Sequence, residues 1–244
     1  MTTVRDVAKM VIPRSFIRTA FALINTVRRQ KFRGKSNSYI FSEIYTKNMW
    51  GGSKDKGFYS GRGSHEEHIV KPYVACCVEF LSSFDTALVV VDLGCGDFNI
   101  GSRIAPAAKE YIACDVVPSL IEDNKKKFNF KNCRFQVVDM SKDEIPAGDV
   151  VIIRQVLQHL SNQDITNVVR KIEKSFDYLI LTEHLPDREF TPNLDKPTGV
   201  DIRAPKSGIV LDKPPFNINF VKKKNLLKVD SVDGSIITDM YQLK

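Results

Sequence analysis

Short apolar runs alternate with helix-like segments through the middle of the chain. Strands are expected near residues 88–93, 110–115, 133–138, 149–154 and 177–183. Before and between them, apolar residues recur at helical spacing near residues 66–83, 99–108, 118–129 and 163–175. The run at residues 88–91 has no alternating polar positions, which suits a strand buried on both faces of a parallel sheet. The alternation predicts an α/β fold with a doubly wound, mostly parallel sheet.

The pattern changes after residue 184. Six of the eleven prolines fall within residues 186–215, and no regular helix can run through them. Long irregular segments are commonly functional lids. Two apolar-rich segments, near residues 225–231 and 235–242, meet at Asp233 and Gly234 and predict a closing antiparallel hairpin. With the five strands above, the sheet would have seven strands.

Four successive strands are followed or ended by residues suited to binding a ligand. The first leads into Gly94 and Gly96, whose spacing lets the backbone turn sharply before a helix that starts near Phe98. Asp115 ends the second strand, at the place where an acid commonly hydrogen-bonds ribose. Asp139 and Arg154 end the third and fourth strands. Because these ends meet at one edge of the sheet, a nucleotide-like ligand is expected there.

Several short motifs together resemble the class I S-adenosylmethionine-dependent methyltransferases. They are DLGCGDFN at residues 92–99, SGRGS at 60–64, RQVLQHLS at 154–161 and N-x-D at 193–195. The GCGDFN form is similar to a bacterial family that is often associated with surface-polysaccharide biosynthesis. The similarity covers roughly residues 40–220 and implies a Rossmann-like fold and S-adenosylmethionine as cofactor. Gln155 stands where family members commonly carry an acid, and they commonly carry a tryptophan near position 201.

The resemblance also implies which residues bind the cofactor. Asp115 would hold the ribose, and Asp139 with Met140 would contact the adenine. Two glycines and two serines before a helix can bind an anion, so residues 60–64 would hold the methionine carboxylate, or else serve as a mobile connector. The expected cofactor-binding residues are Ser60, Gly61, Ser64, Asp92, Gly94, Gly96, Asp97, Asn99, Asp115, Val116, Asp139, Met140 and Arg154.

Methyl transfer to a hydroxyl needs an aligned acceptor and a general base. His159 is the first candidate, because it follows the fourth strand and an ordinary histidine pKa of about 6.5 suits a base at neutral pH. Its alternative role is to cap or pack a helix. Glu183 and His184, at the end of the fifth strand, are the second choice, as base or as ligands of a divalent ion. No metal site is assigned.

The acceptor is expected to be a sugar of a surface glycan or of its precursor, covered by residues 36–59 and 185–215, with Asp195 and Arg203 available to bind a polar or anionic group. The rivals are a small metabolite or lipid-linked intermediate as acceptor, and a cofactor-binding module without turnover. Residues 149–156 lack the N/D-P-P-aromatic tetrad of amino-methyltransferases acting on DNA and RNA, which disfavours a nucleobase.

Charge divides the chain unevenly. Residues 1–35 contain nine basic side chains and one acid, so their net charge is +8. The whole chain has a net charge of +7, so the remaining residues together carry −1. Nucleic acid is therefore not an expected partner. Apolar residues at helical spacing between Phe16 and Val27 predict an amphipathic basic helix, which would lie on an anionic membrane or pack on the body or a partner subunit.

Three segments are expected: a basic helix at residues 1–35, a lid and cofactor loop at 36–65, and the methyltransferase domain at 66–244. The longest apolar runs are too short to span a bilayer, and no secretory signal is expected. The five cysteines show no C-x-x-C spacing and are expected to be reduced. These features favour the cytoplasm, either free or peripheral at the inner face of the membrane.

Overall fold

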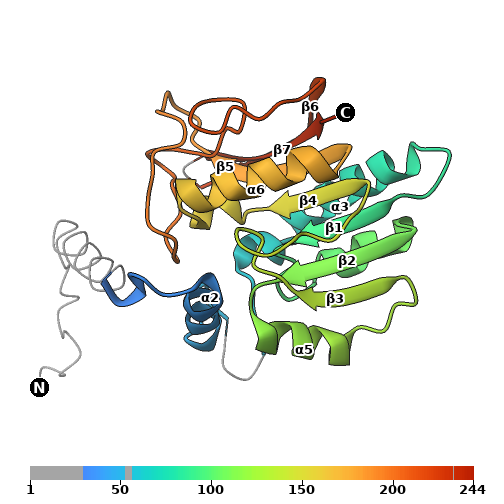
Figure 1. The fold of residues 1–244 in the computed structure, drawn as a ribbon, viewed down its shortest axis with the longest axis horizontal. Coiled ribbons are helices and arrows are strands. Elements are labelled where there is room, and N and C mark those ends of the chain that lie inside the picture. The colour runs from blue at the N-terminus through green and yellow to red at the C-terminus, as the bar shows by residue number, and fades with distance from the viewer. Residues whose placement is uncertain (1–29, 53–56, 233) are drawn as a thin grey trace, which may run out of the picture. The chain divides into compact units, whose positions relative to one another are not determined.

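The fold comes from a computed structural model that describes residues 30–52, 57–232 and 234–244 (Figure 1). Residues 35–244 form one compact unit, which contains the whole sheet and also residues 36–52, expected to form part of a lid. The amphipathic helix expected between Phe16 and Val27 lies outside the described residues. None of the helices in the described part of the chain is both long and apolar enough to cross a membrane.

Seven strands form a single sheet in the order β3-β2-β1-β4-β5-β7-β6. The first five are parallel, and β7 pairs antiparallel with both β5 and β6. The α/β, mostly parallel, Rossmann-like fold with a closing hairpin is therefore confirmed. The strands are β1 (Val89–Leu93), β2 (Glu110–Asp115), β3 (Cys133–Val137), β4 (Val150–Arg154), β5 (Tyr178–Leu185), β6 (Lys222–Ser231) and β7 (Gly234–Gln242).

Helices and single helical turns connect these strands. The connections that contain α4 and α5 lead from β1 to β2 and from β2 to β3, towards one edge of the sheet, whereas the connection that contains α6 leads from β4 to β5, towards the other edge. Because such connections are right-handed, α6 lies on the opposite face of the sheet from α4 and α5 (Figure 1). The elements are α2 (Asn37–Thr46), η2 (Arg62–Ser64), α3 (Glu67–Ser82), α4 (Gly101–Ile104), η3 (Ala105–Ala107), α5 (Pro118–Lys127), η4 (Leu157–His159) and α6 (Asn162–Ser175).

The helix after β1 is shorter than the expected residues 99–108, and its start near Phe98 is wrong. Phe98 has a φ of +60°, which no residue of a right-handed helix adopts, and its ring is fully buried. At the other end, Pro106 has no N–H to continue the hydrogen-bond ladder, and the chain tightens into η3. The glycine turn therefore leads into one short helical turn of four residues.

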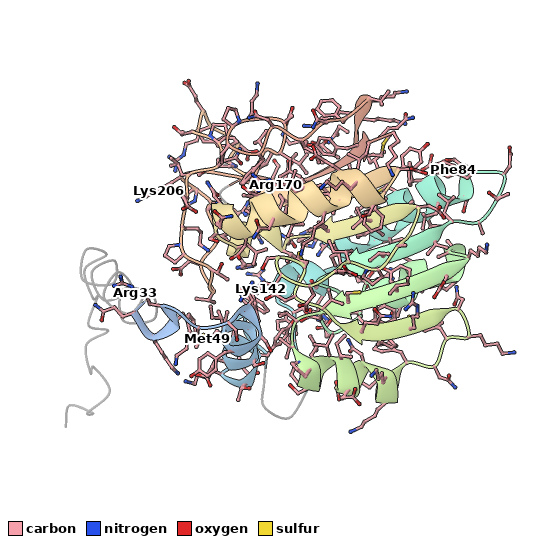
Figure 2. All side chains as sticks on the ribbon, in the orientation of Figure 1. Arg33, Met49, Phe84, Lys142, Arg170 and Lys206 are labelled. Carbon is pink, nitrogen blue, oxygen red and sulfur yellow. The ribbon has the colours of Figure 1, made fainter. Side chains whose placement is uncertain are left out.

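The core lies on both faces of the sheet, and side chains fill the space between sheet and helices (Figure 2). On one face, Tyr73, Cys77 and Leu81 of α3 pack against Val90 of β1 and Tyr111 of β2. All five cysteines have free thiols. The packed sheet fixes the carboxyl ends of its parallel strands, which position the site.

Residues 186–221 contain no regular helix or strand, as the prolines indicated. Asn193 organises this segment from inside. Its side-chain amide donates to the carbonyls of Val210, Lys213 and Pro214 at 2.8, 3.2 and 2.9 Å, and its side-chain oxygen accepts from the amide of Val210 at 2.8 Å. Asn193 thus connects distant parts of the segment to one another from a buried position.

Candidate active site

A cavity of about 370 Å³ lies at the carboxyl ends of the parallel strands. Its wall combines α2 and the loop after it, the loop that includes η2, the ends of the strands, η4, and two residues of the irregular segment. The lining residues are Asn37, Phe41, Tyr45, Trp50, Ser60, Gly61, Arg62, Gly63, Ser64, Gly94, Asp115, Val116, Val138, Asp139, Met140, Arg154, Gln155, Val156, Gln158, His159, Leu160, Val200 and Ile202.

The two glycines after β1 are required by both conformation and space. Gly94 has a φ of +86° and Gly96 a φ of +56°, in the left-handed region that favours glycine. A Cβ on Gly94 would lie 2.4 Å from Val156, and one on Gly96 would lie 2.3 Å from the hydroxyl of Ser60. Of these two glycines, only Gly94 lines the cavity. Gly96 instead lets the loop at Ser60 come close to the sheet.

Asp115 lies at the end of β2 and is almost fully buried. Its carboxylate accepts from the amides of Gly96 at 3.1 Å and Val117 at 3.0 Å, which fixes its orientation in the cavity wall. Burial raises its pKa to about 6, although the hydrogen bonds from these amides oppose the shift. A carboxylate held in this way keeps lone pairs for further donors.

Asp139 lines the same end of the cavity, beside Met140. Its Oδ1 accepts from the side chain of Asn37 at 3.2 Å and from the amide of Ser141 at 3.1 Å. The bond from Asn37 joins α2 to the sheet edge, so the first helix of the compact unit forms part of the wall.

Asp97 and Asn99 do not line the cavity, although the motif predicted that they bind the cofactor. Asp97 Oδ2 accepts from the amide of Ser60 at 2.8 Å and pairs with His65 Nε2 at 2.7 Å, while the amide of Asp97 donates to Ser60 Oγ at 2.8 Å. Asn99 Nδ2 donates to the carbonyl of Ser64 at 2.7 Å. We call these bonds the loop clasp. It fastens residues 60–65 over the glycine turn.

Of Arg154 and Asp92, both expected to bind the cofactor, only Arg154 lines the main cavity. Arg154 lines the cavity, donates to the carbonyl of Gly63 at 2.7 Å, and lies 4.8 Å from the ring centroid of Tyr73. Asp92 does not line the main cavity but faces a smaller one of about 30 Å³, where it accepts from the hydroxyl of Tyr111 at 2.9 Å. Burial raises the pKa of Asp92 to about 7. The geometry makes Asp92 a support beneath the site.

His159 is part of η4 and lines the cavity. Its ring packs against the ring of Trp50, with centroids 5.2 Å apart. Nδ1 lies 3.3 Å from the carbonyl oxygen of Gly199, and when Nδ1 carries the proton, Nε2 keeps a free lone pair. Burial, with a smaller effect from Lys196, lowers the pKa of His159 to about 3. The imidazole is therefore neutral at physiological pH.

Glu183 and His184, the second choice for the base, are not among the residues that line the cavity. Glu183 is buried, and its two oxygens accept from the amides of Leu157 at 2.9 Å and Gln158 at 3.3 Å. His184 lies within β5, opposite Ile236 of β7. Among the described residues, no three His, Cys, Asp or Glu side chains gather in a way that could hold a metal. The expected metal-assisted route thus has no ligand set there.

Arg203 and Asp195, expected to bind the acceptor, also lie outside the cavity wall. Arg203 is only 6% exposed and points inward. Asp195 Oδ1 accepts from the amides of Asn162 and Lys196, each at 2.8 Å. Both residues therefore fasten the irregular segment to residues 157–162 beside it.

Several wall residues had no assigned role from the sequence. Asn37, Tyr45 and Trp50 come from a segment that the sequence predicted only as a lid over the acceptor. Gln155 has a φ of +54°, and a Cβ on Gly63 would lie 2.5 Å from its side-chain oxygen. A non-glycine residue in this conformation commonly marks a functional site, but the sequence alone does not reveal it.

Comparisons with known proteins agree with this geometry. Residues 91–177, from within β1 to the residue before β5, match a methyltransferase domain family. The match covers 87 of the 244 residues, the part of the chain that contains the glycine turn and the carboxyl ends of β2, β3 and β4. A search of curated protein sequences finds no match.

Solved structures with this fold include the N-methyltransferase NodS from Bradyrhizobium japonicum WM9, in complex with S-adenosyl-L-homocysteine. Its TM-score is 0.60 at 14% identity, over 85% of this chain and 98% of that one. The N-terminal domain of EvdMO1, in the presence of S-adenosylhomocysteine and D-fucose, has a TM-score of 0.54 at 12% identity, over 97% and 100%. The mitomycin 7-O-methyltransferase MmcR has a TM-score of 0.50 at 16% identity, over 74% and 60%.

NodS binds S-adenosyl-L-homocysteine, and the residues at the strand ends of this chain fit a ligand of that kind. Gly94 leaves a space beside Val156 that a Cβ would fill. Asp115, fixed by two backbone amides, presents a carboxylate to the same cavity, as ribose hydroxyls require. The donor and acceptor groups present thus suit a nucleoside.

Proposed function

We propose that this methyltransferase transfers the methyl group of S-adenosylmethionine to a hydroxyl of a sugar, in a surface glycan or its precursor, in the cytoplasm. One observation carries the proposal: His159 is a neutral imidazole in the wall of the cavity, buried against Trp50. A neutral imidazole can take a proton from a hydroxyl, and a hydroxyl acceptor needs such a base.

The residues of the wall divide between cofactor and acceptor. Asp115 would accept from the ribose hydroxyls, and Asp139 and Met140 would contact the adenine. Residues 60–64, fastened by the loop clasp, and Arg154 would bind the methionine carboxylate, because they combine a positive charge with the start of a helical turn. This division leaves Trp50 and His159 for the acceptor.

The proton transfer keeps the charge of the site balanced. S-adenosylmethionine, when bound, supplies a methyl group on a positively charged sulfur, which becomes neutral once the methyl has left. The acceptor oxygen gains the methyl and releases its proton to Nε2 of His159. The positive charge therefore ends on the imidazole. Burial leaves the ring unprotonated before the reaction, and its pKa of about 3 makes it a weaker base than the ordinary value of about 6.5 expected from the sequence.

The acceptor end of the cavity suits a sugar. It presents the indole of Trp50, on which the apolar face of a sugar ring can pack, beside the amides of Gln155 and Gln158. Val200 and Ile202 of the irregular segment also line the cavity. EvdMO1, whose N-terminal domain shares this fold, was crystallised in the presence of D-fucose, which supports a sugar as the acceptor. The fold also serves an N-methyltransferase, so the choice of oxygen rests on His159.

The test is the variant His159→Ala, assayed with a panel of sugars and sugar nucleotides by the S-adenosylhomocysteine released. A general base typically contributes about 10² to 10⁴ in rate, so kcat should fall by that factor. Calorimetric binding of S-adenosylhomocysteine should stay unchanged. His68→Ala is the matched control, because the side chain of His68 is 66% exposed and lies outside the cavity wall. Turnover of His159→Ala within a factor of about three of the wild type would contradict the proposal.

A further inference from the structure

A buried carboxyl group accepts hydrogen bonds from backbone amides of the helical turn that contains His159. Glu183, in the neighbouring strand β5, is 2% exposed and accepts from the amides of Leu157 and Gln158 at 2.9 and 3.3 Å. These are the two residues that precede His159 in η4. Burial raises the pKa of Glu183 to about 8, while these amides and Arg203 act in the opposite direction.

The same turn is bonded on its carbonyl side by Arg203. Nη1 donates to the carbonyls of Leu157 at 3.0 Å and Gln158 at 3.1 Å, and Nη2 donates to the carbonyl of Leu160 at 2.8 Å. The remaining donors bond the side chain of Asn162 and the carbonyl of Leu194. Every N–H of the guanidinium is therefore used.

The two side chains match the groups that the turn leaves free. The carboxyl oxygens of Glu183 accept from amides at the start of the turn, and Arg203 donates to carbonyls at its end, which favour a positive charge. Hydrogen bonds from an ionised group are about twice as strong as neutral ones. Burying a guanidinium is costly, and here the buried Arg203 and Glu183 are both used on the residues next to His159.

The loop that contains Arg203 also touches His159 itself. The carbonyl of His159 accepts from the amide of Gly199 at 3.0 Å and from Lys196 Nζ at 3.1 Å. The carbonyl of Gly199 lies 3.3 Å from Nδ1 of the imidazole. Fixing the loop at Arg203 thus fixes the partner that selects the tautomer of His159.

We infer that Glu183 and Arg203 are positioning residues, which act through the turn at residues 157–159 to fix the place and the tautomer of the His159 imidazole. This inference deepens the proposed function, in which His159 is the base, and rests on it for the catalytic consequence. The position of the imidazole can be measured without the acceptor, so the two ideas can fail separately.

The first test is an NMR pH titration of the histidine C–H resonances in the full-length protein, between pH 5 and 8. The His159 signal is assigned by its loss in His159→Ala. In the wild type it should not titrate, because burial lowers its pKa to about 3. Arg203→Lys keeps the charge but loses the planar set of donors. In this variant and in Glu183→Gln the ring should gain solvent, and its pKa should rise into the measured range.

The second test is steady-state kinetics with the same variants. Both should lower kcat at least tenfold, with unchanged KM for S-adenosylmethionine and unchanged affinity for S-adenosylhomocysteine. Asp149→Asn is the matched control: its Oδ2 accepts from the amide of Val89 at 2.7 Å, away from the cavity wall, so it should lower the melting temperature alone.

A variant that loses stability but keeps both kcat and a silent His159 signal would overturn the inference. So would a His159 signal that titrates normally in the wild type. If Arg203→Lys does not fold, Glu183→Gln, which keeps the volume and one acceptor oxygen, decides. Full turnover in His159→Ala would instead refute the proposed function and leave the titration result standing.

Discussion

Asp115 illustrates how one side chain serves both the fold and the cofactor. It is held by the amides of Gly96 and Val117 while it lines the cavity. Asp115→Asn keeps the shape and one acceptor but loses the charge, so S-adenosylhomocysteine should bind more weakly by about 1.5 to 3 kcal/mol, the usual value of hydrogen bonds to a charged group. Calorimetry measures this, with Asp123→Asn on α5 as the control. Equal affinity in both variants would remove Asp115 from the nucleoside site.

Asp92 makes a different prediction, about pH. Its pKa is about 7 in the folded protein against 3.8 as the reference, because burial disfavours its charge. Between these values the folded protein binds more protons than the unfolded chain, so Asp92 stabilises the fold at low pH and this stability is lost as the pH rises towards 7. The slope is at most about 1.4 kcal/mol per pH unit.

Asp92→Asn should therefore lose less stability than the wild type between pH 4 and 8. Asp115 and Glu183, whose pKa values are also raised, and His159, whose pKa is lowered, are present in both proteins and cancel in the difference. Chemical denaturation at several pH values measures it. If the free energy of unfolding changed with pH in the same way in both proteins, the prediction that burial raises the pKa of Asp92 would be wrong.

At the scale of elements, the loop clasp should control how long the cofactor stays bound. Asp97→Asn removes the charge that Ser60 and His65 share at 2.8 and 2.7 Å. The loop at residues 60–65 should open more often, and S-adenosylhomocysteine should dissociate roughly tenfold faster, as expected for the loss of one charged hydrogen bond. Stopped-flow displacement measures the rate. Glu67→Gln, which breaks an exposed pair with Arg103, is the control and should leave the rate unchanged.

The sequence predicted the elements better than their tertiary roles. The strands follow from apolar runs buried in the sheet, and the ends of β2, β3 and β4 were found because parallel strands share one edge. The role of Asp97 depends on Ser60, 37 residues away in the chain, and no local pattern carries that contact. The same holds for Glu183. The sequence predicted it at the site because it ends a parallel strand, but its carboxyl group accepts from the backbone of η4.

At the scale of the whole molecule, the main feature is that the net positive charge lies in the first 35 residues and not in the part of the chain that forms the sheet. Residues 1–35 carry +8, and residues 36–244 carry −1. The helix α2 begins at Asn37 with Ser36 as its cap, so a chain that starts at Ser36 keeps the first element of the compact unit intact. The basic segment can thus be removed without taking a strand or a cap from the sheet.

We propose that this segment binds anionic membranes, where each basic residue contributes about 1 kcal/mol near the surface. Deleting residues 1–35 should abolish co-sedimentation with vesicles of phosphatidylglycerol and leave the melting temperature and the affinity for S-adenosylhomocysteine unchanged. For the full chain, raising the salt from 0.1 to 1 M shortens the screening length from about 10 to 3 Å, so the binding should be lost. Neutral phosphatidylcholine vesicles are the control. If the truncated protein binds anionic vesicles as strongly as the full chain, the membrane role of the basic segment is wrong.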